Sequence, residues 1–151
     1  MESGVGILDH IAVVVRNLKE ARKFYEGVLG GRFMYELEQP EKGYRLCKIE
    51  LYRLSIELLE PLGPASFLQA FLNKRGEGLH HVTFNLPGAK WETERLKECG
   101  VEMIDDTDTP ARYESFISPR SSHGVLIQFI SGYSAWSLAN EYEQRRRDKS
   151  G

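Results

Sequence analysis

Two distant segments of the chain share one alternation of apolar and polar positions. LDHIAVVV at Leu8–Val15 and LHHVTFNL at Leu79–Leu86 each place a histidine, His10 or His81, ahead of alternating apolar residues. A period of two residues is typical of a β-strand whose two faces meet different surroundings. We therefore predict two strands that open equivalent halves of the chain.

A pattern with helical spacing begins seven residues after each histidine. One helix is predicted over residues 17–30, where Asn17 and Glu20 form a capping pair. The other is predicted over residues 88–100, with Trp91 among its apolar anchors. Both stretches end on a glycine, a residue that commonly terminates helices.

Each half also contains a later strand in which a polar residue stands between apolar residues. SIELLEP contains Glu57, and VLIQFIS contains Gln128. Glu57 follows His10 by 47 residues, and Gln128 follows His81 by the same 47. The common order and spacing indicate an internal duplication of one unit, which consists of a strand, a helix and a run of strands.

One domain is expected over residues 1–151, because no linker rich in proline, glycine or serine separates the halves. Its expected parts are module one at about 6–60, a linking helix at 66–75, module two at about 78–131 and a C-terminal helix at about 133–147. Ser66 is the expected cap of the linking helix.

Strand alternation places four polar side chains on faces opposite the apolar ones. If the halves pair symmetrically, the four meet on one concave sheet: His10, Glu57, His81 and Gln128. Two imidazoles, a carboxylate and an amide oxygen are suitable ligands for a divalent transition metal. The alternative is that each histidine is a hydrogen-bonded residue of the core or surface. The equal spacing in both halves favours the metal site. We expect His80 to pack on the other face and His123 to lie exposed in a turn.

The composition is that of an ordinary globular protein. The chain is 41% hydrophobic and 28% charged with a net charge of -2, so no cationic field favours nucleic acid. Its longest uncharged apolar run, Ile11–Val15, is far shorter than the roughly 20 residues of a membrane span. No signal peptide is recognisable, and Cys47 and Cys99 suggest no disulfide framework. We expect a cytoplasmic protein with no membrane or nucleic-acid partner.

Three stretches carry a resemblance to a known family: LDHIAVVVRNLKEARKFYEGVLG, SIELLEPLGPASFLQAFLNKRGEGLHHVTF and SPRSSHGVLIQF. They resemble the vicinal oxygen chelate (glyoxalase, bleomycin resistance and dioxygenase) superfamily, and most of all its methylmalonyl-CoA epimerase branch. The resemblance implies an α+β fold in which two paired βαβββ modules form a curved mixed sheet around a central metal site. It also implies a homodimer with one divalent ion per chain (Co, Mn, Ni, Zn or Fe), held by His10, Glu57, His81 and Gln128.

The activity that the resemblance implies is that of an isomerase or epimerase acting on a small molecule such as an acyl-CoA. Such an enzyme shifts a proton at the carbon α to a carbonyl, and its metal stabilises the enolate. Inversion at that carbon requires groups on both of its faces.

The chain departs from the family pattern at two places in its second half. Its last strand reads GVLIQF where the family carries a ligating glutamate, so Gln128 offers an uncharged oxygen that cannot act as a base. DDTDTPARYES stands where the epimerases have a basic, glycine-rich loop. That change leaves Arg112 and Arg120 as the candidates for binding a phosphate or carboxylate of the substrate, with Tyr113 and Glu114 as weaker acid–base candidates.

A third departure concerns the acid–base groups. Some epimerases have a catalytic glutamate where this chain has Leu46. Lys48 and Glu50, which share the face of Leu46, are candidate replacements, and Glu57 is a further candidate. The alternative for Lys48 and Glu50 is a surface ion pair on an edge strand.

Two other functions remain open. One is a different reaction on the same scaffold, such as a lyase, glyoxalase-like or cyclase step on a specialised metabolite. The other is a metal-free, small-molecule-binding protein of the resistance type, against which the two candidate ligand histidines argue.

Overall fold

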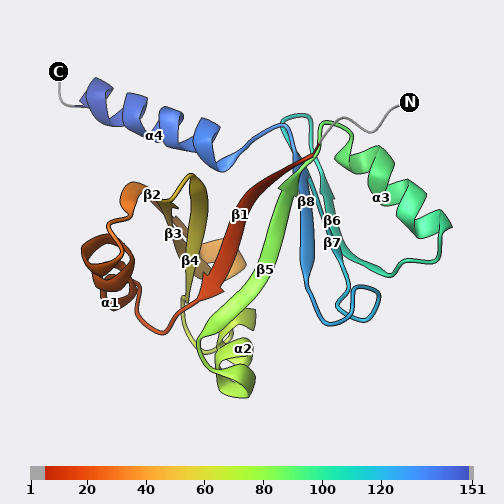
Figure 1. Cartoon of the computed structure of the whole chain (residues 1–151), viewed down its shortest axis with the longest axis horizontal. Coiled ribbons are helices and arrows are strands. Elements are labelled where there is room, and N and C mark those ends of the chain that lie inside the picture. The colour runs from red at the N-terminus through yellow and green to blue at the C-terminus, as the bar shows by residue number, and fades with distance from the viewer. Residues whose placement is uncertain (1–5, 150–151) are drawn as a thin grey trace. The chain divides into compact units, whose positions relative to one another are not determined.

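Eight strands form one mixed sheet in the computed structural model, which describes residues 6–149 (Figure 1). The strands are β1 Ile7–Val14, β2 Arg32–Gln39, β3 Tyr44–Leu51, β4 Leu54–Pro61, β5 Gly78–Asn85, β6 Met103–Asp108, β7 Tyr113–Ile117 and β8 Ile127–Ser131. The helices are α1 Leu18–Arg22, α2 Phe67–Arg75, α3 Ala89–Glu98 and α4 Ala135–Lys149, with a π-helical segment at Lys23–Val28 and a 3-10 turn at Pro40–Lys42. The predicted α+β class is confirmed.

The strand order repeats in the two halves of the chain. The order is β2-β3-β4-β1-β5-β8-β7-β6, so the first strand of each half lies next to its fourth, followed by its third and second. β5 and β8 run parallel, whereas β3 is antiparallel to β2 and β4, and β7 to β6 and β8. The duplicated βαβββ arrangement is therefore confirmed.

The chain divides into two compact units, each of which takes segments from both halves. The first unit contains the residues up to His10 together with His81–Leu138, and the second contains Ile11–His80 and the residues from Ala139 onward. A division into compact units does not determine the number of domains, so one domain over residues 1–151 stays a prediction.

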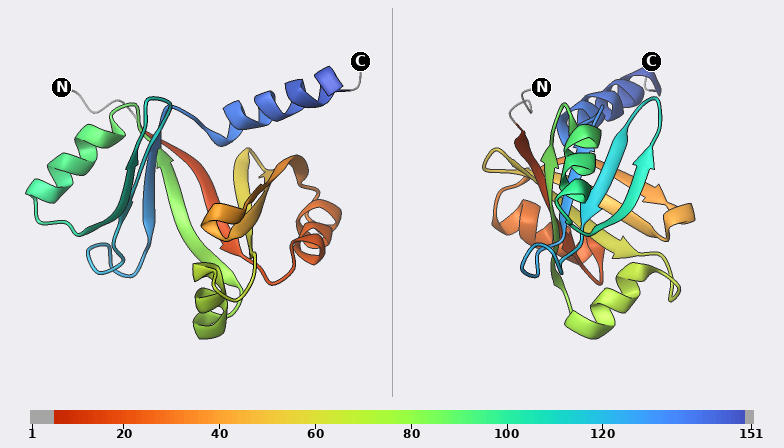
Figure 2. Two further views of the ribbon diagram at one scale, coloured as in Figure 1. Left: turned by 180° about the vertical axis from the view of Figure 1, so that it is seen from behind. Right: turned by 90° about the vertical axis from the view of Figure 1, so that its right-hand side faces the viewer.

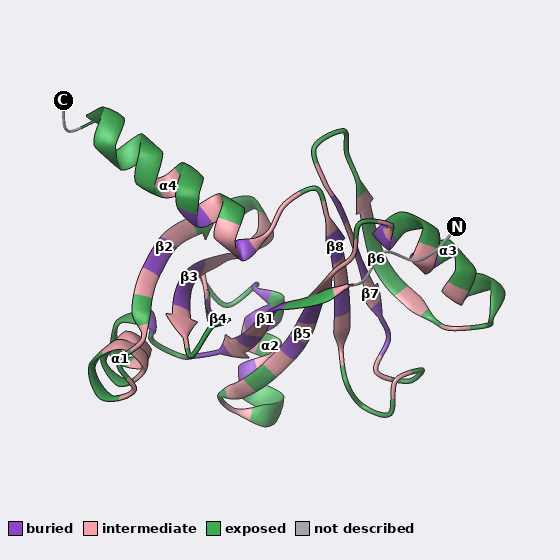
Figure 3. Cartoon of the chain, turned by 45° about the horizontal axis from the view of Figure 1, so that its top comes forward, coloured by how far each residue is buried: buried purple, intermediate pink, exposed green. Residues whose placement is uncertain are grey.

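The core of the second unit confirms the apolar strand faces that alternation predicts. Its buried members come from β3, β4, α1 and the residue that follows β1: Val15, Leu18, Cys47, Ile49, Ile56 and Leu58. Ile11 and Val13 of β1 pack against this cluster. Later in the unit, Tyr142 of α4 contacts the rings of Phe33 and Tyr35 on β2. The rest of the C-terminal part of α4 is mostly exposed (Figure 3).

The helix expected over residues 17–30 begins as predicted but changes its winding. Asn17 caps it, since its Oδ1 accepts the Glu20 N–H at 2.9 Å. After Arg22 the α-helix gives way to a π-helical segment, so a single α-helix is wrong. Adjacent apolar residues, Phe24 and Tyr25, hide this widened turn in the sequence, because either one continues a helical pattern. In the structure Tyr25 packs against the core and Phe24 is exposed.

In the first unit, α3 lies along β7 and β8 (Figure 2). It buries Ala89 and Thr93, and the Thr93 hydroxyl lies 2.8 Å from that of Ser115 on β7. Trp91, the expected anchor, is 41% exposed, so that expectation is wrong. The small residues four apart let the helix approach the sheet closely, and Trp91 lies off their face.

Two segments differ from the predictions, and a third agrees. DDTDTPARYES is not a loop but most of the β6–β7 hairpin, closed by a turn in which Thr109 and Arg112 exchange backbone hydrogen bonds. The C-terminal helix begins at Ala135 and ends at Lys149, two residues later at each end than expected. The linking helix runs over Phe67–Arg75, with Ser66 as its predicted cap. None of the helices within residues 6–149 combines the length and apolar character that a membrane span requires.

Candidate functional site

His10 is buried in the middle of β1 and is hydrogen-bonded to its neighbour in the chain. Its Nδ1 lies 2.7 Å from Oδ1 of Asp9, and both side chains are buried. A carboxylate only accepts hydrogen bonds, so a neutral His10 carries its proton on Nδ1. The lone pair of Nε2 then faces away from Asp9, as in a histidine that binds a metal through Nε2.

Thr83 of β5 lies between His10 and Gln128. Its Oγ1 is 3.0 Å from Nε2 of His10 and 2.7 Å from Oε1 of Gln128, and the β5–β8 register pairs Thr83 directly with Gln128. The hydroxyl has one hydrogen to donate, whereas a neutral His10 and the amide oxygen both present lone pairs. An imidazole nitrogen and an amide oxygen that lie together in this way are suitable ligands for a cation.

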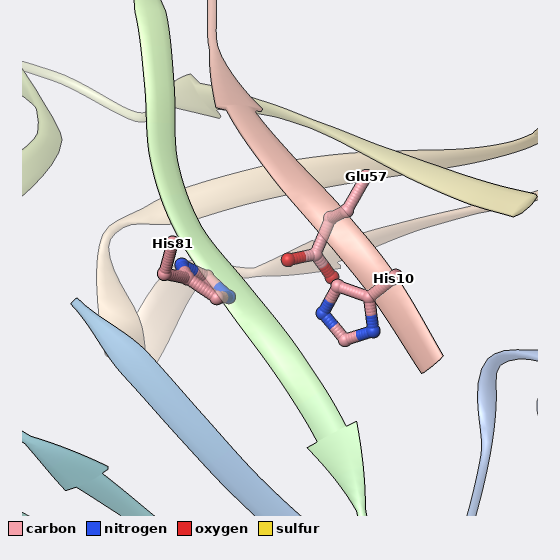
Figure 4. A group of neighbouring side chains, drawn as sticks. All are labelled: His10, Glu57 and His81. Carbon is pink, nitrogen blue, oxygen red and sulfur yellow. The ribbon is translucent and has the colours of Figure 1, made fainter. Parts of the chain in front are cut away.

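His81 completes the buried group in the first unit. The ring centroids of His10 and His81 are 5.8 Å apart in an edge-to-face arrangement, and the centroid of Phe116 on β7 lies 5.8 Å from that of His81. Three of the four expected ligands, His10, His81 and Gln128, thus occur in one unit. Figure 4 draws the two histidines together with Glu57, whose strand β4 precedes β1 and β5 in the sheet order.

Glu114 of β7 determines which way the amide of Gln128 points. Its Oε2 accepts a hydrogen bond from the Tyr133 hydroxyl at 3.1 Å and a long one from Nε2 of Gln128 at 3.5 Å. Since a carboxylate cannot donate, the NH₂ group of Gln128 turns toward Glu114 and the amide oxygen turns toward Thr83. Arg112 lies 5.7 Å over the Tyr133 ring and therefore near this group.

In the second unit, Glu57 forms a buried ion pair with Lys48. The two residues face each other across β3 and β4, with Nζ of Lys48 3.1 Å from Oε1 of Glu57. Lys48 is only 3% exposed, and β3 lies between β2 and β4. A surface pair of Lys48 with Glu50 on an edge strand is therefore wrong. Glu50 instead accepts a 2.7 Å hydrogen bond from Arg32, and Leu46 is buried.

The remaining candidates lie apart from these groups. Arg120 is exposed in the turn before β8, as is His123. His80 packs against the rings of Phe67 and Phe71 on α2, as expected of a packing residue, and burial lowers the pKa of its imidazole.

The candidates taken from the sequence omit three residues that hold this group together: Asp9, Thr83 and Tyr133. A carboxylate directly before a histidine in an apolar strand is a usable signal for Asp9, because a buried carboxylate needs a partner. Thr83 and Tyr133 depend on the pairing of distant segments, for which the sequence has no comparable signal.

Comparison with known proteins agrees with the resemblance in the sequence. A model of the Glyoxalase/Bleomycin resistance protein/Dioxygenase superfamily matches residues 9–116. The chain is 35% identical over 124 residues to the uncharacterized protein YqjC of Bacillus subtilis, covering 80% of this chain and 89% of the relative. It is 30% identical over 129 residues to the mitochondrial methylmalonyl-CoA epimerase of Dictyostelium discoideum, covering 83% and 78%.

A solved structure gives the same picture. The crystal structure of methylmalonyl-CoA epimerase from Mycobacterium tuberculosis superposes with a TM-score of 0.75 at 26% identity, covering 87% of this chain and 91% of that one. Similarity to epimerases in both sequence and structure supports an epimerase-like role. The matched family model, the relatives and the duplicated βαβββ fold together show that the chain belongs to the glyoxalase/bleomycin resistance/dioxygenase superfamily.

Proposed function

We propose that the protein is a metal-dependent isomerase that moves a proton at the carbon α to a carbonyl, with an acyl-CoA such as methylmalonyl-CoA as its substrate. The observation that carries the proposal is the buried group of His10, His81 and Gln128 around Thr83, which brings two imidazoles and an amide oxygen together. The names of the relatives support the reaction class.

The proposed metal ligands are His10, Glu57, His81 and Gln128. Either histidine offers an imidazole nitrogen, and Glu57 offers a carboxylate oxygen. Their strands β4, β1 and β5 are consecutive in the sheet, and β8 with Gln128 follows. This donor set suits Co, Mn, Ni, Zn or Fe. A divalent ion held by these residues would supply Lewis acidity to the substrate and so make its α-hydrogen more acidic.

Proton transfer is assigned to the chain's own side chains. Lys48 is buried beside Glu57, and we assign to its Nζ the proton exchanged with one face of the α-carbon. Inversion requires a second group on the other face. Glu114, held by Tyr133, is the carboxyl group proposed for that role, since the amide of Gln128 cannot accept a proton at neutral pH. Glu50 remains a second candidate for the role of Lys48.

The proposal extends to substrate contacts and assembly. Arg112 and Arg120 are the proposed partners of anionic groups of the substrate. The protein is proposed to act as a cytoplasmic homodimer, and the free thiols of Cys47 and Cys99 fit a reducing compartment. Sedimentation of a monomer at micromolar concentration would contradict the dimer.

Exchange of the α-proton in deuterated water tests the proposed function. Metal-loaded protein should place one deuterium at the α-carbon of methylmalonyl-CoA, detected by mass spectrometry. Chelation or His81→Ala should abolish the exchange. His123→Asn is a matched control at an exposed histidine with φ +54°, a conformation that asparagine tolerates. Absence of exchange in metal-loaded protein would refute the substrate class, and full exchange after chelation would refute the role of the metal.

A further inference from the structure

We propose that Asp9 is a positioning residue that sets the tautomer of His10 and joins this histidine to the first turn of α4. The inference rests on the proposed function in one respect, namely that His10 is a metal ligand. The inference concerns the carboxylate of Asp9, which is not a proposed metal ligand, and helix α4. The proposed function assigns a role to neither.

Asp9 is a buried carboxylate whose two oxygens both face donors. It is 1% exposed. Oδ1 lies 2.7 Å from Nδ1 of His10, and the backbone N–H of Ala135 lies 3.2 Å from Oδ1 and 3.3 Å from Oδ2. Nδ2 of Asn85 is 3.4 Å from Oδ2. A buried carboxylate is stable only with such partners, so these contacts define its orientation.

The contact with Ala135 places Asp9 at the beginning of α4. Ala135 is the first residue of this helix, and its N–H belongs to the first turn, where backbone donors have no acceptor within the helix. Ser134 and Ser137 exchange hydrogen bonds between their hydroxyls and backbone N–H groups, which fixes the same turn. A negative charge is also favourable at a helix N-terminus. One carboxylate therefore holds both α4 and His10.

The segment that leads into α4 is joined to the same group. Nδ2 of Asn85 donates to the carbonyl oxygen of Tyr133 at 2.7 Å, and the Tyr133 hydroxyl donates to Glu114. Asn85 thus contacts both Asp9 and the residue that holds Glu114. A shift at the start of α4 would move the partners of His10 and of Gln128 together.

Asparagine at position 9 would remove this arrangement without changing the shape of the side chain. An amide has one oxygen and one NH₂ group, whereas both oxygens of Asp9 accept hydrogen bonds. If the NH₂ group faces Ala135 and Asn85, donors oppose donors. If it faces His10 instead, Nδ1 must accept, and the proton of a neutral imidazole moves to Nε2, which then has no lone pair for a metal.

The tautomer of His10 is the first test, and it needs no metal. In metal-free protein labelled with ¹⁵N-histidine at pH 8.5, where an ordinary imidazole is neutral, two-bond proton–nitrogen correlations distinguish the two tautomers. The wild type should show the proton on Nδ1, and Asp9→Asn should shift His10 toward the other form. The amide proton of Ala135 should also exchange faster with solvent in Asp9→Asn. Asp105→Asn, at an exposed position, is the matched control and should change neither measurement.

Metal affinity is the second test, measured for Zn²⁺ by competition with a chromophoric chelator. Asp9→Asn should bind 10- to 100-fold more weakly, the usual effect of losing an outer partner of a ligand histidine. A proton on Nε2 in the wild type, or equal affinities of wild type and Asp9→Asn, would overturn the inference. If the wild type binds no metal, the proposed function fails, and the tautomer of His10 in the two proteins still decides the role of Asp9.

Discussion

Gln128→Glu should destabilise the metal-free protein, because it sets a second carboxylate against Glu114. In the wild type the amide NH₂ group of Gln128 faces Oε2 of Glu114 at 3.5 Å. The substitution replaces this donor by an acceptor of nearly identical shape. Gln128 is 7% exposed, so water can screen the new contact only in part.

The structure sets the size of the effect. Two unit charges 3.5 Å apart repel by about 5 kcal/mol at an effective dielectric constant of about 20. The protein can avoid this repulsion by protonating one carboxyl group, which at pH 7.5 costs about 4 kcal/mol for a group with an ordinary pKa of about 4.3. The smaller cost limits the destabilisation to about 4 kcal/mol at pH 7.5. At pH 5.0 the same protonation costs only about 1 kcal/mol, so the loss should shrink as the pH falls.

Urea unfolding of chelator-treated protein at pH 7.5 and 5.0 measures this effect. The control is the double variant Glu114→Gln with Gln128→Glu, which exchanges the two groups and restores a donor opposite a carboxylate. It should recover most of the stability lost in the single variant. Equal free energies of unfolding for wild type and Gln128→Glu at both pH values would refute the contact and the amide orientation derived from it.

Two further predictions concern the second unit. Burial raises the pKa of the Cys47 thiol to about 12 from its ordinary 9.0, so the thiol of the unfolded state loses its proton at lower pH than that of the folded state. The contribution of this thiol to the free energy of unfolding should therefore be fully present below pH 9. It should fall by up to about 1.4 kcal/mol per pH unit as the pH rises toward 12. Cys47→Ala should lack this component in unfolding curves between pH 9 and 11, and parallel curves for the two proteins would show that the thiol is not buried as described. Lys48→Met should slow α-proton exchange by at least about 100-fold, the usual range for a lost acid–base group, while Glu50→Gln should have little effect because its carboxylate is bound to Arg32. The reverse order of effects would transfer the role to Glu50.

Local patterns predict much of this fold, because its signals are short-range. The side chain of Asn17 marks its own helix start, and alternation along β1, β3 and β4 separates the core face from the face that carries Lys48 and Glu57. The equal spacing of His10 to Glu57 and of His81 to Gln128 reflects the duplicated strand order. These features depend on neighbours in sequence or on a repeat, and both are visible without a structure.

What the patterns miss depends on pairing between distant segments. The ion pair of Lys48 with Glu57 follows from the β3–β4 register, which the sequence does not state. Thr83 contacts Gln128 because β5 and β8 are parallel neighbours in one particular register. The π-helical segment after α1 widens the helix without changing its apolar pattern. In each case a polar pair or a turn is determined by backbone alignment rather than by residue type.

Titration of metal-free protein with Co²⁺ tests most directly whether the buried histidines hold a metal. Visible absorption bands of bound Co²⁺ should grow to an end point of about one ion per chain, in keeping with an imidazole and oxygen ligand set. His81→Ala should abolish these bands, whereas His80→Ala should retain them, because the His80 ring packs against Phe71 of α2. Absence of binding in the wild type, or equal loss in both variants, would contradict the metal site on which the account depends.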